Sequence, residues 1–376
     1  MKRISILVLN LCACFVSVAW GQPPTCKVHT PWAELHKYNM RRSNPCEKVL
    51  SVNNVGNLGL NWSYTTGNAV FSSPAMASGV VYFGSLDSNV YALNASTGVK
   101  LWSYTTGNYV ESSPAVANGV VYVGSLDHKV YALNASTGVK LWSYTTGNLV
   151  FSSPAVAKGV VYVASEDGKV YALNASTGAK LWSYPTGNYV LSSPAVANGV
   201  VYVGSHDTNV YALNASTGAK LWNYTTGDYV ESSPAVANGV VYVGSVDNNL
   251  YALNASTGAK LWSYTTGNLV ISSPAVAKGV VYVGSYDGNV YALNAKTGVK
   301  LWSYTTGNIV ESSPAVANGV VYVGSFDSNV YALNAKTGTK LWSYTTGNLV
   351  FPSPAVANGM VYVGSQDGNV YAFGLK

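Results

Sequence analysis

The sequence YALNASTGVKLWSYTTG at residues 91–107 recurs unchanged at 131–147, and near copies begin at residues 171, 211, 251, 291 and 331. A period of 40 residues is typical of propellers and solenoids, in which each unit buries its apolar faces against its neighbours. This period outweighs the two or three ordinary domains that a chain of 376 residues would otherwise suggest.

Each unit contains four short runs of β-branched and aromatic residues, separated by turn residues. In the unit that starts at Ser112, the turns fall at Asn118-Gly119, at Ser125–Asp127 and at Asn134–Gly138. Asn-Gly favours a tight hairpin, and Asp or Asn can accept hydrogen bonds from the backbone that follows. The run VVYV is apolar at successive positions, which is typical of a strand buried on both faces. One unit therefore predicts one four-stranded antiparallel sheet packed between two others.

The two ends of the repeat region complement each other. The final unit has only three strands, whereas residues 58–64 have the sequence of a fourth strand without the first three. If 58–64 completes the last unit, the ring closes and no sheet is left uncovered. We therefore predict an all-β, eight-bladed β-propeller of four-stranded antiparallel blades over residues 58–376. Pro74, Pro114 and their equivalents are expected within the innermost strands, whose free edge tolerates proline.

Residues 1–21 have the pattern of a secretory signal peptide. Two basic residues precede an apolar run over 4–19, and Ala19-Trp20-Gly21 has small residues on either side of Trp20. The run is short for a membrane span. A lipoprotein cleavage site at Leu11–Cys14 is the alternative. We expect a secreted, extracellular protein, periplasmic or at the cell surface in a bacterium, with no membrane span.

Residues 22–57 are predicted to form an N-terminal arm. It contains Cys26 and Cys46, the two cysteines that remain after cleavage. In an exported chain two such cysteines are expected to pair, so we predict a Cys26–Cys46 disulfide. His29 and His36 lie near them, but the spacing matches no standard zinc site, and we expect no metal here.

The segment ALNASTGVKLW over residues 92–102 resembles the tryptophan-docking motif of the PQQ (pyrroloquinoline quinone) repeat, although Asn94 stands where that family usually has Asp. The resemblance covers about residues 58–376. It implies a propeller in which the tryptophan of each outer strand has a structural role and packs on the neighbouring blade. The tryptophans in question are Trp62, Trp102, Trp142, Trp182, Trp222, Trp262, Trp302 and Trp342.

The resemblance implies two kinds of function. Quinoprotein dehydrogenases bind PQQ and Ca²⁺ at the centre of the ring and carry insertions that build the site. BamB-like assembly factors are similar propellers that bind proteins without a cofactor. The present chain lacks insertions between its units and lacks adjacent cysteines after residue 21. These differences leave its status as an enzyme uncertain and favour a protein without catalytic residues or a cofactor.

Residues that could act in catalysis recur in every unit or stand alone. An Asp present in every unit indicates a turn role, because a catalytic Asp would be unique; these are Asp87, Asp127, Asp167, Asp207, Asp247, Asp287, Asp327 and Asp367. The pair Ser72-Ser73 is repeated with no unique His or acid beside one copy, which argues against a hydrolase. His128 and His206 are single turn residues and are expected to be solvated.

The units differ mainly at one end of the predicted ring, where the second strand turns into the third and where the chain enters the first strand. The predicted binding face has two sets of residues. Those that lead into the first strand are Phe71, Glu111, Phe151, Leu191, Glu231, Ile271, Glu311 and Phe351. Those in the turn between the second and third strands are Glu166, His206, Tyr286 and Phe326. The three strand-leading acids are expected to lie spread around the channel mouth, with phenylalanines on the intervening blades. Neutral drift among recent duplicates is the alternative explanation.

The other end is uniform. Five of its turns begin Asn-Ala-Ser, at Asn94, Asn134, Asn174, Asn214 and Asn254, and this is a glycosylation sequon, as are those at Asn61 and Asn223. An asparagine that starts a turn is a sufficient explanation by itself.

These observations lead to one hypothesis and two alternatives. The leading hypothesis is a secreted, non-catalytic propeller that binds an extracellular protein or polysaccharide, or serves as a wall or matrix component. The alternatives are a PQQ- and Ca²⁺-dependent alcohol or polyol dehydrogenase and a carbohydrate-binding propeller. A nucleic-acid partner is not expected, because the net charge of +6 is small and scattered.

Overall fold

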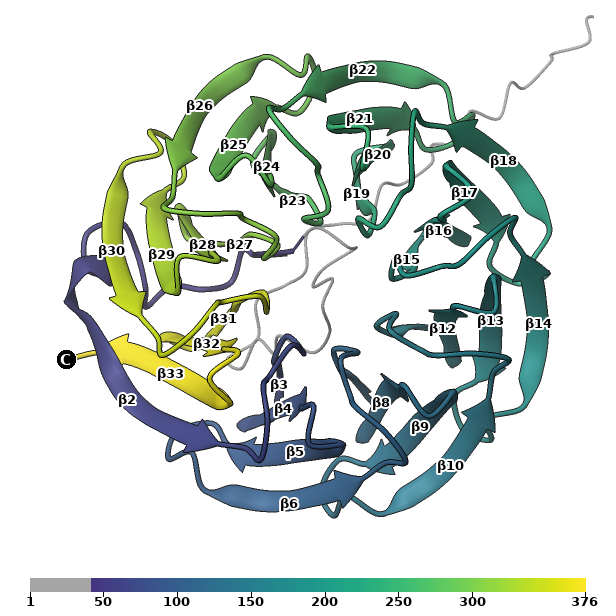
Figure 1. Cartoon of the computed structure of the whole chain (residues 1–376), viewed down its shortest axis with the longest axis horizontal. Coiled ribbons are helices and arrows are strands. Elements are labelled where there is room, and N and C mark those ends of the chain that lie inside the picture. Colours follow the sequence, from purple (N-terminus) through teal and green to yellow (C-terminus); the bar gives the residue numbers. More distant parts are fainter. Residues whose placement is uncertain (1–41) are drawn as a thin grey trace, which may run out of the picture.

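The computed structural model describes residues 42–376, which form a ring of eight β-sheets around a central channel (Figure 1). Each sheet is one blade, and its strands follow one another from the channel outward. Blades 1 to 4 are β3 (Ala75–Ala77), β4 (Val80–Gly84), β5 (Asn89–Asn94), β6 (Lys100–Thr105); β7 (Ala115–Ala117), β8 (Val120–Ser125), β9 (Lys129–Asn134), β10 (Lys140–Thr145); β11 (Ala155–Ala157), β12 (Val160–Ser165), β13 (Lys169–Asn174), β14 (Lys180–Pro185); and β15 (Ala195–Ala197), β16 (Val200–Gly204), β17 (Asn209–Asn214), β18 (Lys220–Thr225).

The remaining blades repeat the same pattern. Blades 5 to 8 are β19 (Ala235–Ala237), β20 (Val240–Gly244), β21 (Asn249–Asn254), β22 (Lys260–Thr265); β23 (Ala275–Ala277), β24 (Val280–Gly284), β25 (Asn289–Asn294), β26 (Lys300–Thr305); β27 (Ala315–Ala317), β28 (Val320–Gly324), β29 (Asn329–Asn334), β30 (Lys340–Thr345); and β31 (Ala355–Ala357), β32 (Met360–Gly364), β33 (Asn369–Leu375), β2 (Leu58–Thr65).

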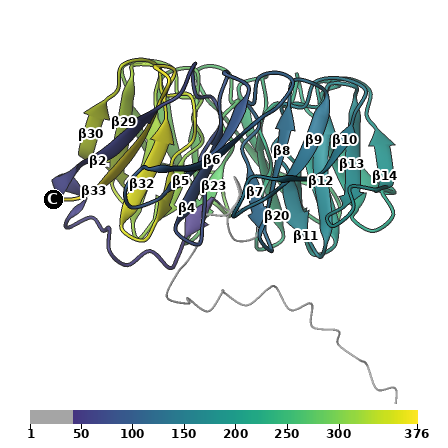
Figure 2. The ribbon, with the colours of Figure 1, turned by 90° about the horizontal axis from the view of Figure 1, so that it is seen from below.

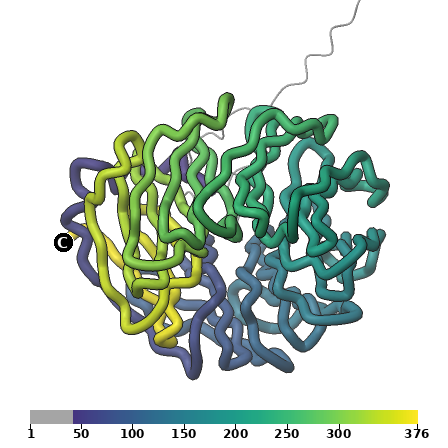
Figure 3. The backbone as a smooth tube through the Cα atoms, turned by 45° about the horizontal axis from the view of Figure 1, so that its top comes forward, coloured from purple at the N-terminus to yellow at the C-terminus, as the bar shows by residue number. Residues whose placement is uncertain are grey.

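The predicted ring closure is confirmed. Strand β2 pairs antiparallel with β33, with Trp62 opposite Ala372, so the first strand of the propeller is the outermost strand of the last blade. Figure 3 shows the purple N-terminal segment beside the yellow C-terminal blade. The closing strand is one residue longer than predicted and ends at Thr65.

The innermost strands are shorter than expected. Each has three residues and begins at the alanine that follows the proline, as β3 does at Ala75 after Pro74. The prolines therefore precede the strands instead of lying within them. This position has a simple cause, because a residue without an N–H cannot contribute a donor to the ladder.

Adjacent blades are joined by two hydrogen bonds to one carbonyl. Trp102 of blade 1 donates its indole N–H to the carbonyl of Ala135 in blade 2 at 2.9 Å, and the Tyr82 hydroxyl donates to the same oxygen at 3.1 Å. Gly138 of blade 2 lies under the indole, with φ of 73°, and a Cβ there would come within 2.7 Å of it. Every outer-strand tryptophan makes the corresponding indole bond, at 2.9–3.1 Å.

The repeated serine pairs form a second set of bonds around the channel. The backbone N–H of Ser73 donates to the hydroxyl of Ser113 in the next blade at 2.9 Å, and the same bond recurs at every junction. Ser353 donates to Ser73, which completes the circle. The serines that resembled a hydrolase motif therefore hold the inner ends of the blades together.

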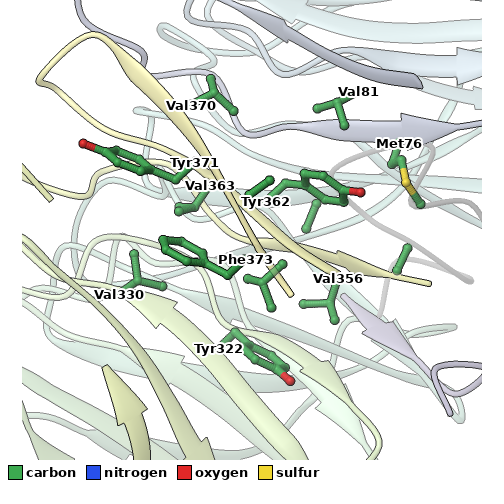
Figure 4. Close-up of a cluster of buried hydrophobic side chains, with 14 of the residues drawn as sticks. Met76, Val81, Tyr322, Val330, Val356, Tyr362, Val363, Val370, Tyr371 and Phe373 are labelled. Atoms are coloured by element: carbon green, nitrogen blue, oxygen red, sulfur yellow. The ribbon is translucent and has the colours of Figure 1, made fainter. Parts of the chain in front are cut away.

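The junction between blades 7 and 8 differs from the others. The Trp342 indole donates to the carbonyl of Leu58, supplied by the N-terminal segment, at 3.0 Å. The buried Tyr322 hydroxyl has no hydrogen-bond partner among the described residues, whereas Tyr282 donates to the Ala335 carbonyl at 3.0 Å. Figure 4 shows the apolar cluster at the junction between blades 7 and 8, in which Tyr322 and Phe373 are buried.

The segment 42–57 runs from the channel to the rim across blades 7 and 8, where it is drawn in purple along the lower edge of Figure 2. Strand β1 (Ser43–Asn44) pairs parallel to β27 and gives blade 7 an unpredicted fifth strand. The buried Arg42 donates to the carbonyls of Ser313 and Pro314 at 3.1 and 3.0 Å. A short 3-10 helix, η1 (Val55–Asn57), leads into β2.

Several sequence predictions concern the N-terminal region. The signal peptide at 1–21 and Cys26 lie outside the described residues. Cys46 is buried and disulfide-bonded, and its pairing with Cys26 stays a prediction. None of the helices within residues 42–376 has the length and apolar character needed to cross a membrane.

Ring closure can be tested with two truncations. A chain that begins at residue 67 lacks β2 and the Trp62 contact with blade 1, whereas a chain that begins at residue 58 lacks only the preceding arm. We expect the shorter chain to melt roughly 10 °C or more below the longer one, because deleting a buried tryptophan alone costs about 3–5 kcal/mol. Equal melting temperatures for the two chains, measured by circular dichroism, would contradict this closure.

Candidate binding face

The two variable loops of each blade meet at one end of the ring. In the first blade, the N–H of Leu86, in the turn between the second and third strands, donates to the carbonyl of Ala69, in the loop that enters the blade, at 2.9 Å. At the opposite end, the N–H of Ala95 donates to the carbonyl of Gly79 at 2.9 Å. This bond joins the turn between the third and fourth strands to the turn between the first and second strands. The predicted assignment of loops to the two ends is therefore correct. We call the first end the variable end and the second the uniform end.

The recurring aspartates hold the loops of the variable end. Asp87 accepts hydrogen bonds from the Gly67 N–H at 2.8 Å, the Asn89 N–H at 3.0 Å and the Tyr91 hydroxyl at 2.6 Å. The equivalent Asp–Tyr bond occurs in every blade. Each aspartate therefore ties the loop entering its blade to its own turn, as a structural turn residue does.

These hydrogen bonds also affect ionisation. Burial disfavours the charged carboxylate of Asp87, but the bonds donated by Tyr91, Gly67 and Asn89 outweigh this effect and hold its pKa below the usual value. The same balance lowers the pKa of Asp207, Asp287 and Asp327.

All of the predicted face residues are half-buried at the variable end. Residues that lead into an innermost strand contact the turn of the preceding blade. The ring nitrogen Nε2 of His206 in blade 4 lies 3.1 Å from a carboxylate oxygen of Glu231 in blade 5. In the same way, the Tyr286 hydroxyl of blade 6 donates to Glu311 of blade 7. The face is therefore a chain of contacts between neighbouring blades.

Aromatic side chains cover one arc of this face. Phe71 and Phe351 meet edge to face with centroids 4.9 Å apart, and Phe351 stacks on Phe326 at 6.0 Å. Tyr286 lies 6.5 Å from Phe326 and continues the arc. Four adjacent blades, from blade 6 through blade 8 to blade 1, thus contribute to one half-buried aromatic cluster. Phe151 belongs to blade 3 and lies outside it.

A polar arc occupies blades 4 and 5. The His206 ring stacks on Tyr229 with centroids 4.8 Å apart and lies 6.4 Å from Tyr189. Burial raises the pKa of Glu166 in the preceding blade, and the nearby His206 and His128 oppose this rise. The expectation that His206 is simply solvated is wrong, because this side chain packs between a tyrosine and an acid.

The three strand-leading acids lie on blades 2, 5 and 7, and two of them influence each other. Burial raises the pKa of Glu311 to about 7; the hydrogen bond from Tyr286 lowers it, and the charge of Glu231 raises it further. Glu231 and Glu311 therefore lie within electrostatic range of each other, although blade 6 stands between their blades.

Sequence analysis missed three exposed tyrosines on this face. Tyr109, Tyr189 and Tyr229 precede the innermost strands of blades 2, 4 and 5 and have 44%, 50% and 43% of their surface exposed. Their position also varies between units, since Ala69 and Leu149 occupy it elsewhere. Variation of this position between units is the sequence signal that identifies them.

Ca²⁺ and PQQ would need converging oxygen ligands and cationic side chains at the variable end. Ca²⁺ needs several converging oxygens, yet the part of the chain that the structure describes contains no group of three or more His, Cys, Asp or Glu placed to hold a metal. Glu231 is paired with His206 and Glu311 accepts from Tyr286. None of the predicted face residues is a lysine or arginine that could face the carboxylates of PQQ. We derive no redox step for this site.

Comparisons with known proteins agree with this architecture. The family profile described as outer membrane protein assembly factor BamB matches residues 58–148 and 105–229, and the β-propeller profile of beta-alanine-activating enzyme matches residues 196–376. The chain is a β-propeller of PQQ-like repeats. A sequence search of curated proteins found no match.

Solved structures with this fold have diverse functions. BamB from Moraxella catarrhalis aligns with a TM-score of 0.75 and 21% identity over 84% of this propeller chain and 99% of its own. The quinohemoprotein alcohol dehydrogenase ADHIIG from Pseudomonas putida HK5 aligns at 0.79 and 19% over 92% and 80%. The computationally designed Ika8 protein aligns at 0.75 and 20% over 82% and 97%. At these identities the likeness shows the fold alone.

The aspartates predict acid sensitivity. An aspartate whose pKa is lower in the folded state stabilises the fold above its unfolded pKa of about 3.9, and this stability is lost as pH falls through the folded pKa. We therefore expect the free energy of unfolding to fall below about pH 4. At pH 7, Asp287→Asn should cost about 1–3 kcal/mol in urea denaturation, because the amide cannot accept the bonds to the second oxygen.

Asp228→Asn is the matched control for Asp287→Asn. Asparagine is the residue that the other units have at this position. The side-chain oxygen Oδ1 of Asp228 accepts the N–H of Tyr229, and Oδ1 of Asn108 accepts the N–H of Tyr109 in the same way. A neutral effect is expected. If both variants lose the same stability, the aspartates have no special role in the loops.

The raised pKa of Glu311 predicts an opposite pH dependence at higher pH. Because the folded protein retains this proton from about pH 4.5 to about 7, the contribution of Glu311 to stability falls as pH rises through that window. Glu311→Gln should therefore stabilise the protein above pH 7, by as much as about 3 kcal/mol, and have little effect near pH 4. Urea denaturation at both values measures this difference, and parallel pH profiles for the two proteins would contradict it.

Proposed function

We propose that this propeller is an exported scaffold that binds a protein partner through its variable end. The observation that carries the proposal is the contrast between the two ends. Otherwise uniform blades carry different residues at one end, and there an aromatic cluster lies beside a polar arc with three exposed tyrosines. Aromatic side chains with polar neighbours are typical of protein interfaces.

The comparisons support this proposal in a general way. BamB is described as an outer membrane protein assembly factor, and its fold spans most of the present chain. We infer by analogy a role outside the cytoplasm, in agreement with the signal peptide predicted for residues 1–21. The designed Ika8 propeller has a comparable fold, so the fold by itself does not assign a function, and the proposal rests on the residues of the variable end.

Two alternatives have different support. A polysaccharide ligand is favoured by the exposed tyrosines, whose rings could stack on sugar rings. A PQQ-dependent dehydrogenase is favoured only by the fold of neighbours such as the alcohol dehydrogenase ADHIIG. Dye reduction by the purified protein with PQQ, Ca²⁺ and a simple alcohol would support that enzyme.

The exposed tyrosines allow a test that preserves the fold. We expect the combined change of Tyr109, Tyr189 and Tyr229 to Ser to reduce capture of a partner about tenfold or more, because aromatic anchors dominate interface energies. The measurement is quantitative mass spectrometry of proteins captured from the exported fraction of the source cells. Binding is then repeated with the purified partner.

The control replaces exposed valines at the uniform end. Val99, Val139 and Val299 have 61%, 62% and 61% of their surface exposed, and their change to Ser should leave capture unchanged. If the valine variant loses the partner and the tyrosine variant retains it, the variable end is not the binding face.

A further inference from the structure

The N-terminal arm fills a groove between two blades at the uniform end. Leu50 and Val55 are fully buried and pack in one apolar cluster with Ala317, Val320 and Val356 of blades 7 and 8. Leu341, on the lip of the groove, is half-buried beneath this segment, whereas its equivalents in other blades, such as Leu181, are 51% exposed. The arm thus shows what this type of groove can hold.

Polar contacts fix the arm in the groove. A carboxylate oxygen of Glu47 accepts the N–H of Gly359 at 3.1 Å, and the other accepts from Leu50 at 3.1 Å. The Asn318 side chain donates to the Leu50 carbonyl at 2.9 Å, and the Asn44 side chain donates to the Val356 carbonyl at 2.9 Å. The arm thus places a leucine in the groove three residues after a glutamate that bonds to the turn at Gly359.

Related grooves elsewhere are open, although part of their wall is the turn between the third and fourth strands, such as Ala215 and Ser216, which blade 8 lacks. One lies between blades 1 and 2, with a volume of about 500 Å³, and another lies between blades 3 and 4 and reaches blade 5, with a volume of about 540 Å³. The walls of the second include Ala157, Val160, Tyr162, Leu181, Val196 and Gly199. Forty-residue periodicity makes these the counterparts of Ala317, Val320, Tyr322, Leu341, Val356 and Gly359 in the filled groove.

The open grooves also retain the backbone donor that Glu47 uses. Gly119 and Gly199 occupy the position of Gly359 in the same tight turn, with φ of 76° and 78° against 76°. At the position of Asn318, the groove between blades 3 and 4 has Lys158. This cation adds an attraction for an acidic side chain.

We propose that the open grooves at the uniform end bind an extended segment of a partner protein that carries an acidic residue three positions before a leucine. The leucine occupies the apolar groove as Leu50 does, and the acid meets the turn glycine N–H as Glu47 does. The arm of the same molecule is not the occupant, because β1 pairs with β27 and Leu50 is already buried between blades 7 and 8. This site is separate from the binding face at the variable end and does not depend on it.

The probe for the test is a fluorescent synthetic peptide with the sequence of residues 44–56, with serine in place of Cys46. We expect saturable binding to the purified full chain, measured by fluorescence anisotropy. Replacing the peptide leucine with aspartate should weaken binding about tenfold or more, the effect of losing one buried leucine. Replacing its glutamate with glutamine should weaken binding severalfold, because an ionised acceptor makes the stronger hydrogen bond.

Protein variants locate the site. Leu101 and Leu181 line the open grooves and are each 51% exposed, so changing both to Asp should preserve the fold and weaken peptide binding about tenfold or more. Leu261 and Leu301 have the same exposure, but Val276 and Val316 at their junctions are buried, and changing these leucines to Asp should not alter binding. Thermal melts confirm folding of both variants.

Three results would overturn the proposal. One is the absence of saturable binding, and another is equal loss in the two leucine variants. The third is sedimentation evidence that the chain associates with itself and that Leu101→Asp with Leu181→Asp abolishes the association, since the occupant would then be a second copy. Loss of the variable-end partner in the tyrosine variant leaves this test unaffected, so the two proposals fail independently.

Discussion

The ring depends on one repeated contact, in which an alanine carbonyl accepts hydrogen bonds from the tryptophan indole and the tyrosine hydroxyl of the preceding blade. In the first junction, the Ala135 carbonyl accepts from Trp102 and Tyr82, while the glycine beneath the indole permits close approach. The contact joins a large apolar surface to two buried hydrogen bonds, so that neither polar group remains unpaired. The paired contact recurs at every junction except that between blades 7 and 8, where the N-terminal segment supplies the acceptor for the indole.

Near-identical blades create a problem of register that the closing junction addresses. Any outer strand of this sequence could pair with any third strand, since the blades differ at few core positions. The last blade carries Phe373 where the others have leucine, and the arm before β2 fills the groove between blades 7 and 8. Its Glu47 and Asn44 side chains bond to backbone groups of blade 8, and Asn318 of blade 7 donates to the carbonyl of Leu50 in the arm. These contacts favour one partner for β2 over its equivalents.

The division between a uniform and a variable end follows from where the structure tolerates change. Residues inside the blades contact two neighbours, and the aspartates and serines are used in hydrogen bonds at each repeat. Positions at the mouth of the channel contact the loops of an adjacent blade, so that a glutamate can meet a histidine in one place and a tyrosine in another. A rigid frame with interchangeable mouth residues suits recognition of a broad partner surface.

The sequence by itself determined the blade count, the strand order and the closure by residues 58–64. These features depend on contacts within one repeat or between a repeat and its copy, and a period of 40 residues displays them directly. It also determined the structural role of the recurring aspartates, because a residue present in every blade serves each blade alike. The twelve face residues and their common end could be predicted for the same reason.

Only the tertiary structure decided which face residues touch. Glu231 meets His206 and Glu311 meets Tyr286 because a strand-leading residue faces the turn of the preceding blade, a relation that involves two loops far apart in the sequence. The burial of Leu50 between blades 7 and 8 could not be predicted either, because the arm has no repeated copy with which to compare it. Packing between non-repeated and repeated segments leaves no periodic pattern, and the structure is needed to show it.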